Sequence, residues 1–202
     1  MRKLLFVTRN CCFLLLLVTF LCKSTEVNVS AQTNVISRQV AIPTQEIDYR
    51  QEFINNTDTY ISKEYVGYVY DICMKYNVCP ELIIAMIEAE SSGDRYCTSP
   101  SNAQGLMQII PKWHMERAYS LGVTDLYDPY SNILVGVDLI ADYVETYQDL
   151  PLVLMVYNEG AYHGAVERAE SEQYSEYAQK IMQRSSELQK AKENQEKLKY
   201  RR

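Results

Sequence analysis

The stretch LIIAMIEAESS, residues 82–92, decides the fold. Its apolar side chains run together as in a buried helix, and Pro80 suits the first turn of that helix. Glu90 lies at the end of the apolar run, just before Ser92-Gly93, which ends the helix. A carboxylate on an apolar helix is costly unless it is paired or used. Because burial raises a carboxyl pKa, Glu90 has the property that a general acid needs near neutral pH.

Further helical patterns lie on both sides of this stretch. Apolar residues within 62–76 recur at three- and four-residue steps, which is typical of one face of a helix. Asp128 suits the N-cap position of the longest pattern. Only 7 Gly and 6 Pro occur, and no strand-like alternation is found, so we predict a compact all-α domain. The expected helices span residues 62–76, 80–91, 112–121, 130–148, 152–157 and 165–182.

Four segments are expected along the chain. Arg2, Lys3 and Arg9 precede or border an uncharged run at 11–22, which is typical of an export signal and short for a membrane span. We therefore predict a signal peptide, or alternatively an uncleaved N-terminal membrane anchor, that places the protein outside the cytoplasm. The predicted segments are 1–31 as signal or anchor, 32–60 as a linker or lead-in, 61–184 as the domain, and 185–202 as a charged helical tail.

The charge of the chain disfavours nucleic acid as a partner. The net charge is −6, and residues 32–184 alone hold 10 basic and 22 acidic side chains. Such a body repels a phosphate backbone, whereas a neutral or sugar-like substrate is compatible with it. His114 and His163 lie far apart with no paired cysteine motif, so we predict no metal site.

Three cysteines lie outside the N-terminal segment: Cys73, Cys79 and Cys97. In an exported domain this odd count allows one disulfide and one free thiol. A bridge from Cys97 to Cys73 or Cys79 would fasten the loop after the Glu90 helix. The alternative is three reduced, buried thiols.

Four short motifs occur in a fixed order. The first is Glu90-Ser91, and the last is Tyr157-Asn158 followed by Gly160. Between them lie Ser99 with residues 103–108, AQGLMQ, and then Asp128-Pro129 with Asn132 and Gly136.

In this order the motifs resemble the catalytic domain of the soluble lytic transglycosylases, lysozyme-like enzymes that cut bacterial peptidoglycan. The resemblance covers about residues 80–164 and implies a lysozyme-like, all-α fold. Two positions depart from the family pattern: Asn102 stands where a glycine is usual, and Val156 stands where an alanine is usual. Both flank the motifs, so they put loop geometry and fine substrate choice in doubt more than activity.

The resemblance also implies the chemistry. Glu90 would protonate the leaving oxygen of a β-1,4 glycosidic bond and then act as base on the sugar's 6-hydroxyl. The substrate's N-acetyl group would replace a second carboxylate, and the product would be a 1,6-anhydro sugar formed without a cofactor. Glu88, two residues earlier, is expected to be a surface residue.

The supporting residues are expected to act on the substrate or on the acid. Tyr157 would hydrogen-bond Glu90 or the substrate, and Ser99 belongs to the most specific motif. Gln108 and Asn132 would offer amide donors and acceptors to acetamido and hydroxyl groups. Met107 would give a soft apolar wall for a sugar face. The alternatives are that Met107 belongs to the core and that Asn132 only supports the start of a helix.

Two alternatives to a lytic transglycosylase stay open. One is a muramidase on the same scaffold, which releases a reducing sugar with water. The other is a catalytically weak cell-wall-binding module of a secretion or conjugation apparatus, with residues 185–202 as its docking segment. The expected partners are therefore peptidoglycan strands, a membrane through an N-terminal tether, and cell-envelope machinery.

Overall fold

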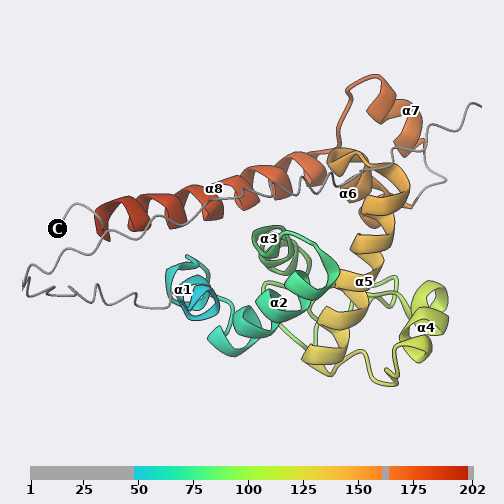
Figure 1. The fold of residues 1–202 in the computed structure, drawn as a ribbon. Coiled ribbons are helices and arrows are strands. Elements are labelled where there is room, and N and C mark those ends of the chain that lie inside the picture. The colour runs from blue at the N-terminus through green and yellow to red at the C-terminus, as the bar shows by residue number, and fades with distance from the viewer. Residues whose placement is uncertain (1–47, 161–163, 200–202) are drawn as a thin grey trace, which may run out of the picture. The chain divides into compact units, whose positions relative to one another are not determined.

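The computed structural model describes residues 48–160 and 164–199, with side chains as far as residue 194. Within this part of the chain the secondary structure is helical, apart from isolated bridges that join Gln104 to Thr98 and Ile109. The all-α prediction is therefore confirmed. The eight helices of the described residues are α1 (Tyr49–Asn56), α2 (Lys63–Tyr76), α3 (Pro80–Ser91), α4 (Pro111–Ser120), α5 (Pro129–Tyr147), α6 (Leu150–Glu159), α7 (Ala165–Glu170) and α8 (Glu176–Lys199) (Figure 1).

Helix α3 lies at the centre of the packing. Residues 80–87 are buried on every side, because α2 and α8 both pack against this helix. Continuous burial explains why the segment is apolar all round rather than amphipathic. The helix ends where Ser92 takes a left-handed conformation with φ 53°. This end carries Glu90 to the edge of the core.

Helix α5 begins as its sequence predicts. The Asp128 side chain accepts a hydrogen bond of 2.9 Å from the backbone N–H of Ser131, and Pro129 occupies the first turn. The Asp128 cap therefore satisfies one of the donors that a helix N-terminus leaves unpaired. Asp149 caps α6 in the same way through the N–H of Leu152, at 3.1 Å.

The expected helix at 165–182 is two helices instead of one. Helix α7 ends at Glu170, Glu172 has a left-handed φ of 56°, and α8 begins at Glu176. Polar residues 171–173 separate the two apolar patterns, and the Ser175 hydroxyl accepts from the N–H of Ala178 at 3.2 Å. The break frees α8 to run in its own direction along α3 (Figure 1).

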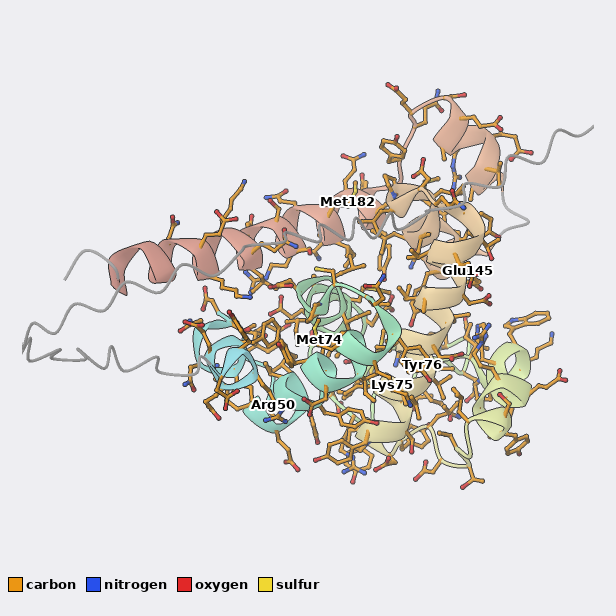
Figure 2. The ribbon with its side chains drawn as sticks, viewed as in Figure 1. Arg50, Met74, Lys75, Tyr76, Glu145 and Met182 are labelled. Atoms are coloured by element: carbon orange, nitrogen blue, oxygen red, sulfur yellow. The ribbon has the colours of Figure 1, made fainter. Side chains whose placement is uncertain are left out.

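Packing extends beyond the expected 61–184 domain at both ends. Helix α1 lies within the expected lead-in, yet its Phe53 is only 1% exposed. Arg50 pairs with Asp71 of α2 at 2.6 Å and lies between these helices (Figure 2). Helix α8 passes through residue 184 without a break, and its Leu188 is only 2% exposed. The described residues thus form one packed unit from α1 to α8.

Leu188→Ala is expected to lower the free energy of unfolding by about 3 kcal/mol, because it leaves a cavity beneath α8. Urea unfolding of the whole chain measures this change. Lys190→Ala is the control, since Lys190 is exposed on the same helix and should change stability by less than about 0.5 kcal/mol. Equal effects of the two changes would mean that the predicted tail does not pack on the domain.

The expected disulfide does not form in this structure. Cys73, Cys79 and Cys97 are all free, but of the three expected buried thiols only Cys73 is buried, while Cys79 and Cys97 are partly exposed. Burial raises the pKa of Cys73 far above that of an ordinary thiol. The Cys79 thiol instead contacts Glu81 and Gln189, each at 3.2 Å.

The predicted export signal or anchor, residues 1–31, lies outside the described residues. Among the residues that are described, no helix has both the length and the apolar character needed to cross a membrane.

Candidate active site

Glu90 lies in the last turn of α3 and is partly buried. Its Oε1 accepts a hydrogen bond of 2.6 Å from the hydroxyl of Tyr177, near the start of α8. Burial raises the pKa of Glu90, and the Tyr177 hydrogen bond offsets part of that rise because it stabilises the carboxylate. A carboxyl group with a raised pKa keeps more of its proton near neutral pH, as a general acid requires.

Tyr157, in α6, hydrogen-bonds the loop and not the Glu90 carboxyl group. Its hydroxyl donates to the backbone carbonyl of Met107 at 2.6 Å. Burial raises the pKa of Tyr157 well above its usual value, and interactions with Glu90 and Tyr143 raise it further. Tyr157 is therefore a neutral phenol within electrostatic reach of Glu90, and Tyr177 makes the contact with the acid that was expected of Tyr157.

Asn132 holds the loop that carries the most specific motif. Its Oδ1 accepts from the N–H of Met107 at 2.7 Å, and its Nδ2 donates to the carbonyls of Gln104 and Leu126 at 2.8 Å each. The side chain is fully buried, with three backbone partners. Asn132 thus supports the loop, and its amide is not presented to a substrate.

The other residues of this motif also secure the loop. The Gln108 amide donates to the carbonyls of Cys97 and Gly105 at 3.1 and 2.9 Å. The Ser99 hydroxyl accepts from the N–H of Ala103 at 3.1 Å. Both side chains remain partly exposed.

Met107 lies in the core. Its side chain is fully buried and packs closely on Gly136 of α5, so it offers no wall to a sugar. The contribution of Met107 to the site is its backbone: the N–H binds Asn132, and the carbonyl binds Tyr157.

Ser91 joins the acid's helix to the same loop. Its hydroxyl donates to the carbonyl of Leu106 at 2.8 Å, and it accepts from the N–H of Gly93 at 3.2 Å. The residue next to Glu90 is therefore fixed to the residue next to Met107. The four motifs meet through these backbone contacts, which set where the Glu90 carboxyl group lies.

Glu88 is not a surface residue, contrary to expectation. Its side chain is only 10% exposed, and its Oε2 pairs with Arg184 Nε at 2.7 Å. The Thr59 hydroxyl donates to its Oε1 at 2.6 Å. The sequence pattern of α3 could not reveal this contact, because α8 brings Arg184 across from 96 residues away.

The structure adds Tyr177 to the predicted site residues. It is one of 17 tyrosines in the chain, in a segment whose helical pattern marks no residue as special. Only the approach of α8 to the end of α3 distinguishes it from the others. Among the described residues, no group of three or more His, Cys, Asp or Glu side chains is arranged to bind a metal ion.

Tyr177→Phe is expected to move the alkaline limb of the pH–activity profile to higher pH. The Tyr177 hydroxyl lowers the pKa of Glu90, so its removal raises that pKa. A general acid works while it is protonated, and activity therefore falls at a higher pH in the variant. The pH dependence of kcat/KM measures the shift, with Tyr174→Phe as the control. An unmoved limb would show that Tyr177 does not influence the catalytic acid.

Comparison with known proteins identifies the family. The family model described as Transglycosylase SLT domain matches residues 68–182, more than half of the chain. A transglycosylase of Enterobacteria phage PRD1 is 39% identical over 95 residues, which cover 47% of this chain and 32% of the phage protein. Membrane-bound lytic murein transglycosylase E of Buchnera aphidicola (subsp. Acyrthosiphon pisum) is 35% identical over 108 residues, covering 49% of this chain and 47% of that protein.

Among solved structures, an inactive mutant of the lytic transglycosylase Slt from Pseudomonas aeruginosa aligns with a TM-score of 0.49 at 18% identity. That alignment covers 59% of this chain and 23% of the Pseudomonas chain. The matched regions span a third to a half of the two relatives named above. By the family match over residues 68–182, which include Glu90, Tyr157 and Tyr177, the chain belongs to the transglycosylase SLT domain family.

Proposed function

We propose that this protein is a lytic transglycosylase that cleaves the β-1,4 bond between N-acetylmuramic acid and N-acetylglucosamine in peptidoglycan. The observation that carries the proposal is the partly buried Glu90, whose pKa is raised and whose carboxylate accepts from Tyr177, within the family's domain. The relatives described above, a transglycosylase and a lytic murein transglycosylase, support the same reaction class.

In the first step, protonated Glu90 gives its proton to the glycosidic oxygen as the bond from that oxygen to C1 of muramic acid breaks. The N-acetyl group of the same sugar stabilises the positive centre at C1. This substrate assistance replaces the second carboxylate that most glycosidases use. Tyr177 donates to the carboxylate that Glu90 becomes, so the negative charge has a hydrogen-bond partner at the moment it forms.

In the second step, the Glu90 carboxylate takes the proton of the sugar's 6-hydroxyl, and O6 forms a bond to C1. The product is a 1,6-anhydro-muramoyl end, and Glu90 is protonated again without consuming water. Tyr157, Asn132, Gln108 and Ser99 act on this chemistry by fixing the loop beside the acid.

Mass spectrometry of fragments released from purified cell walls tests the proposal. Fragments ending in 1,6-anhydro-muramic acid, one water lighter than hydrolytic products and absent with Glu90→Gln, are the expected result. Ordinary reducing ends would instead make the protein a muramidase. A folded protein that binds cell walls but releases no fragments would be the cell-wall-binding module.

We further propose that the protein acts outside the cytoplasm. The predicted signal or anchor at residues 1–31 and the membrane-bound relatives support this location. Fusing residues 1–31 to a reporter that is active only outside the cytoplasm tests it, and an inactive reporter would refute export. A docking role for residues 185–202 is less favoured, because Leu188 is buried in the domain.

A further inference from the structure

A hollow of about 510 Å³ lies between α4 and α5, apart from the loop contacts described above. Trp113, His114 and Arg117 of α4 line one side, and Asp138 and Tyr143 of α5 line the other. The ion pair from Arg117 to Asp138 joins the two helices across it, and Figure 1 shows α4 beside α5. The volume is enough for at least one sugar ring.

Packed helices link the hollow to the proposed catalytic acid. Tyr143 borders the hollow and interacts electrostatically with Tyr157, which in turn interacts with Glu90. Helices α5 and α6, which carry the two tyrosines, pack on each other.

Trp113 is the most unusual residue of the hollow. It is the only tryptophan of the chain, yet it is 67% exposed. The Lys112 ammonium lies over its ring, 4.5 Å from the centroid, and helps to orient the indole. What distinguishes Trp113 from other exposed aromatic residues, such as Tyr119 on the same helix, is that its ring borders the hollow, where a flat ligand ring could stack on it.

The charges of the hollow favour a neutral ligand. Arg117 pairs with both Asp138 and Asp142, so its positive charge is more than balanced. Glu116 adds a negative charge and Lys112, over the Trp113 ring, a positive one, so three carboxylates outnumber two cations. Burial and the neighbouring Arg117 lower the pKa of His114, which leaves that imidazole uncharged near neutral pH. Peptide stems carry carboxylates that this surface would repel, whereas hydroxyl and acetamido groups can bond to its carboxylates and guanidinium.

We propose that the hollow between α4 and α5 is a sugar subsite in which Trp113 stacks on a neutral N-acetylhexosamine ring. The subsite rests on the proposed function for its role, since it would hold the same glycan strand that Glu90 cuts. It would favour stretches of strand whose sugar at this position bears no peptide.

Trp113 itself reports on the subsite, because its fluorescence is the only tryptophan signal of the chain. The experiment is a titration of the whole protein with the β-1,4-linked tetramer of N-acetylglucosamine, which has no peptide and no carboxylate. A saturable blue shift of the emission is expected. Anionic muramoyl dipeptide should produce the shift only at much higher concentration.

Calorimetry of two variants then assigns the contact. Trp113→Ala should weaken binding of the tetramer about tenfold, in line with the loss of one aromatic stacking contact. It should also raise KM on cell walls more than it lowers kcat. Tyr119→Ala is the matched control, since Tyr119 is a 61% exposed aromatic on the same helix that does not line the hollow. Its binding should be unchanged.

The Glu90→Gln variant separates this inference from the proposed function. This variant should lose cleavage of cell walls but keep the blue shift of the Trp113 emission when the tetramer binds. If the tetramer causes no shift of the Trp113 emission in a protein that still cleaves cell walls, the subsite alone would be overturned. A saturable shift in a protein that never cleaves would support the subsite and overturn the proposed reaction.

Discussion

Glu90→Gln is expected to reduce the release of glycan fragments by about a thousandfold, because an amide can neither give nor take the transferred proton. The amide is close to the carboxyl group in size, and its oxygen can still accept from Tyr177. The fold and substrate binding should therefore remain. Fragment release from purified cell walls at pH 7 measures the loss, and residual activity within tenfold of the unchanged protein would contradict the role of Glu90.

The same variant makes a prediction about stability. Since burial raises the pKa of Glu90 in the folded state, the folded state binds its proton more tightly than the unfolded state does. Below the pKa that Glu90 has in the unfolded chain, the side chain is protonated in both states and does not change stability. As pH rises through the higher pKa of the folded state, the cost of charging the buried carboxyl group lowers the free energy of unfolding. Glu90→Gln removes this penalty. Its gain in stability over the unchanged protein should grow from pH 4 to pH 8 in denaturant unfolding.

Glu88→Gln is the matched control, two residues earlier on the same helix. Here the carboxylate pairs with Arg184 and accepts from Thr59, and it is nearly covered. Removing its charge takes from Arg184 the nearer and better buried of its two carboxylates and leaves only the longer pair with Glu187 at 3.8 Å, which should lower the free energy of unfolding by about 2 kcal/mol. Cleavage by the folded fraction should stay within a few-fold of the unchanged protein. The same substitution at the two positions is thus expected to differ in both quantities. At Glu90 it removes cleavage and raises stability, whereas at Glu88 it keeps cleavage and lowers stability.

The local part of the fold was predictable from sequence. Helices α2 to α6 follow apolar periodicity and end at strong signals, such as Pro80 at the start of α3 and Asp128 at the start of α5. The same locality placed Glu90 at the exposed end of a buried helix. These features depend on neighbours within a few residues, and such patterns are legible in one sequence.

The contacts made by α8 were not predictable. Tyr177 on Glu90 and Arg184 on Glu88 join residues 87 and 96 positions apart. The segment after residue 184 looks solvated, because Lys, Glu and Gln dominate it, and one buried leucine per few turns is a weak signal. In the same way, the polar residues around Phe53 of α1 gave no sign in the sequence that this side chain is buried.

The supporting residues stay predictions, and the contacts of Met107 and Asn132 favour a core or supporting role over one that faces a substrate. Asn132 and Met107 belong to the motifs because they shape the loop from inside, through backbone hydrogen bonds and close packing. A sequence motif shows that a position matters, but it does not show which way the side chain points. Only the structure distinguishes a side chain that faces the ligand from one that holds the loop.

Gly105→Ala is expected to lower the free energy of unfolding by about 4 kcal/mol and to disturb the site as well. Gly105 has φ 75°, which an alanine adopts at a cost of about 1 kcal/mol. A Cβ at this position would also overlap the carbonyl oxygen of Leu126 and the amide of Asn132, far inside van der Waals contact. Overlap of this kind cannot be relieved by turning a flexible side chain, because one of the two atoms is backbone.

Gly122→Ala separates backbone strain from steric overlap. Gly122 has nearly the same φ, 76°, but a Cβ there would meet nothing within 4 Å. Gly122→Ala should therefore lower the free energy of unfolding only by the cost of the backbone conformation, about 1 kcal/mol, and leave cleavage unchanged. Denaturant unfolding of the two variants measures the difference.

If both variants lose the same free energy of unfolding, the close approach of Gly105 to Asn132 would not be what holds the loop. If Gly105→Ala alone loses stability and cleavage together, the loop's position and the acid's activity depend on the same contact, because Asn132, Met107 and Tyr157 are joined in one chain of hydrogen bonds beside Glu90.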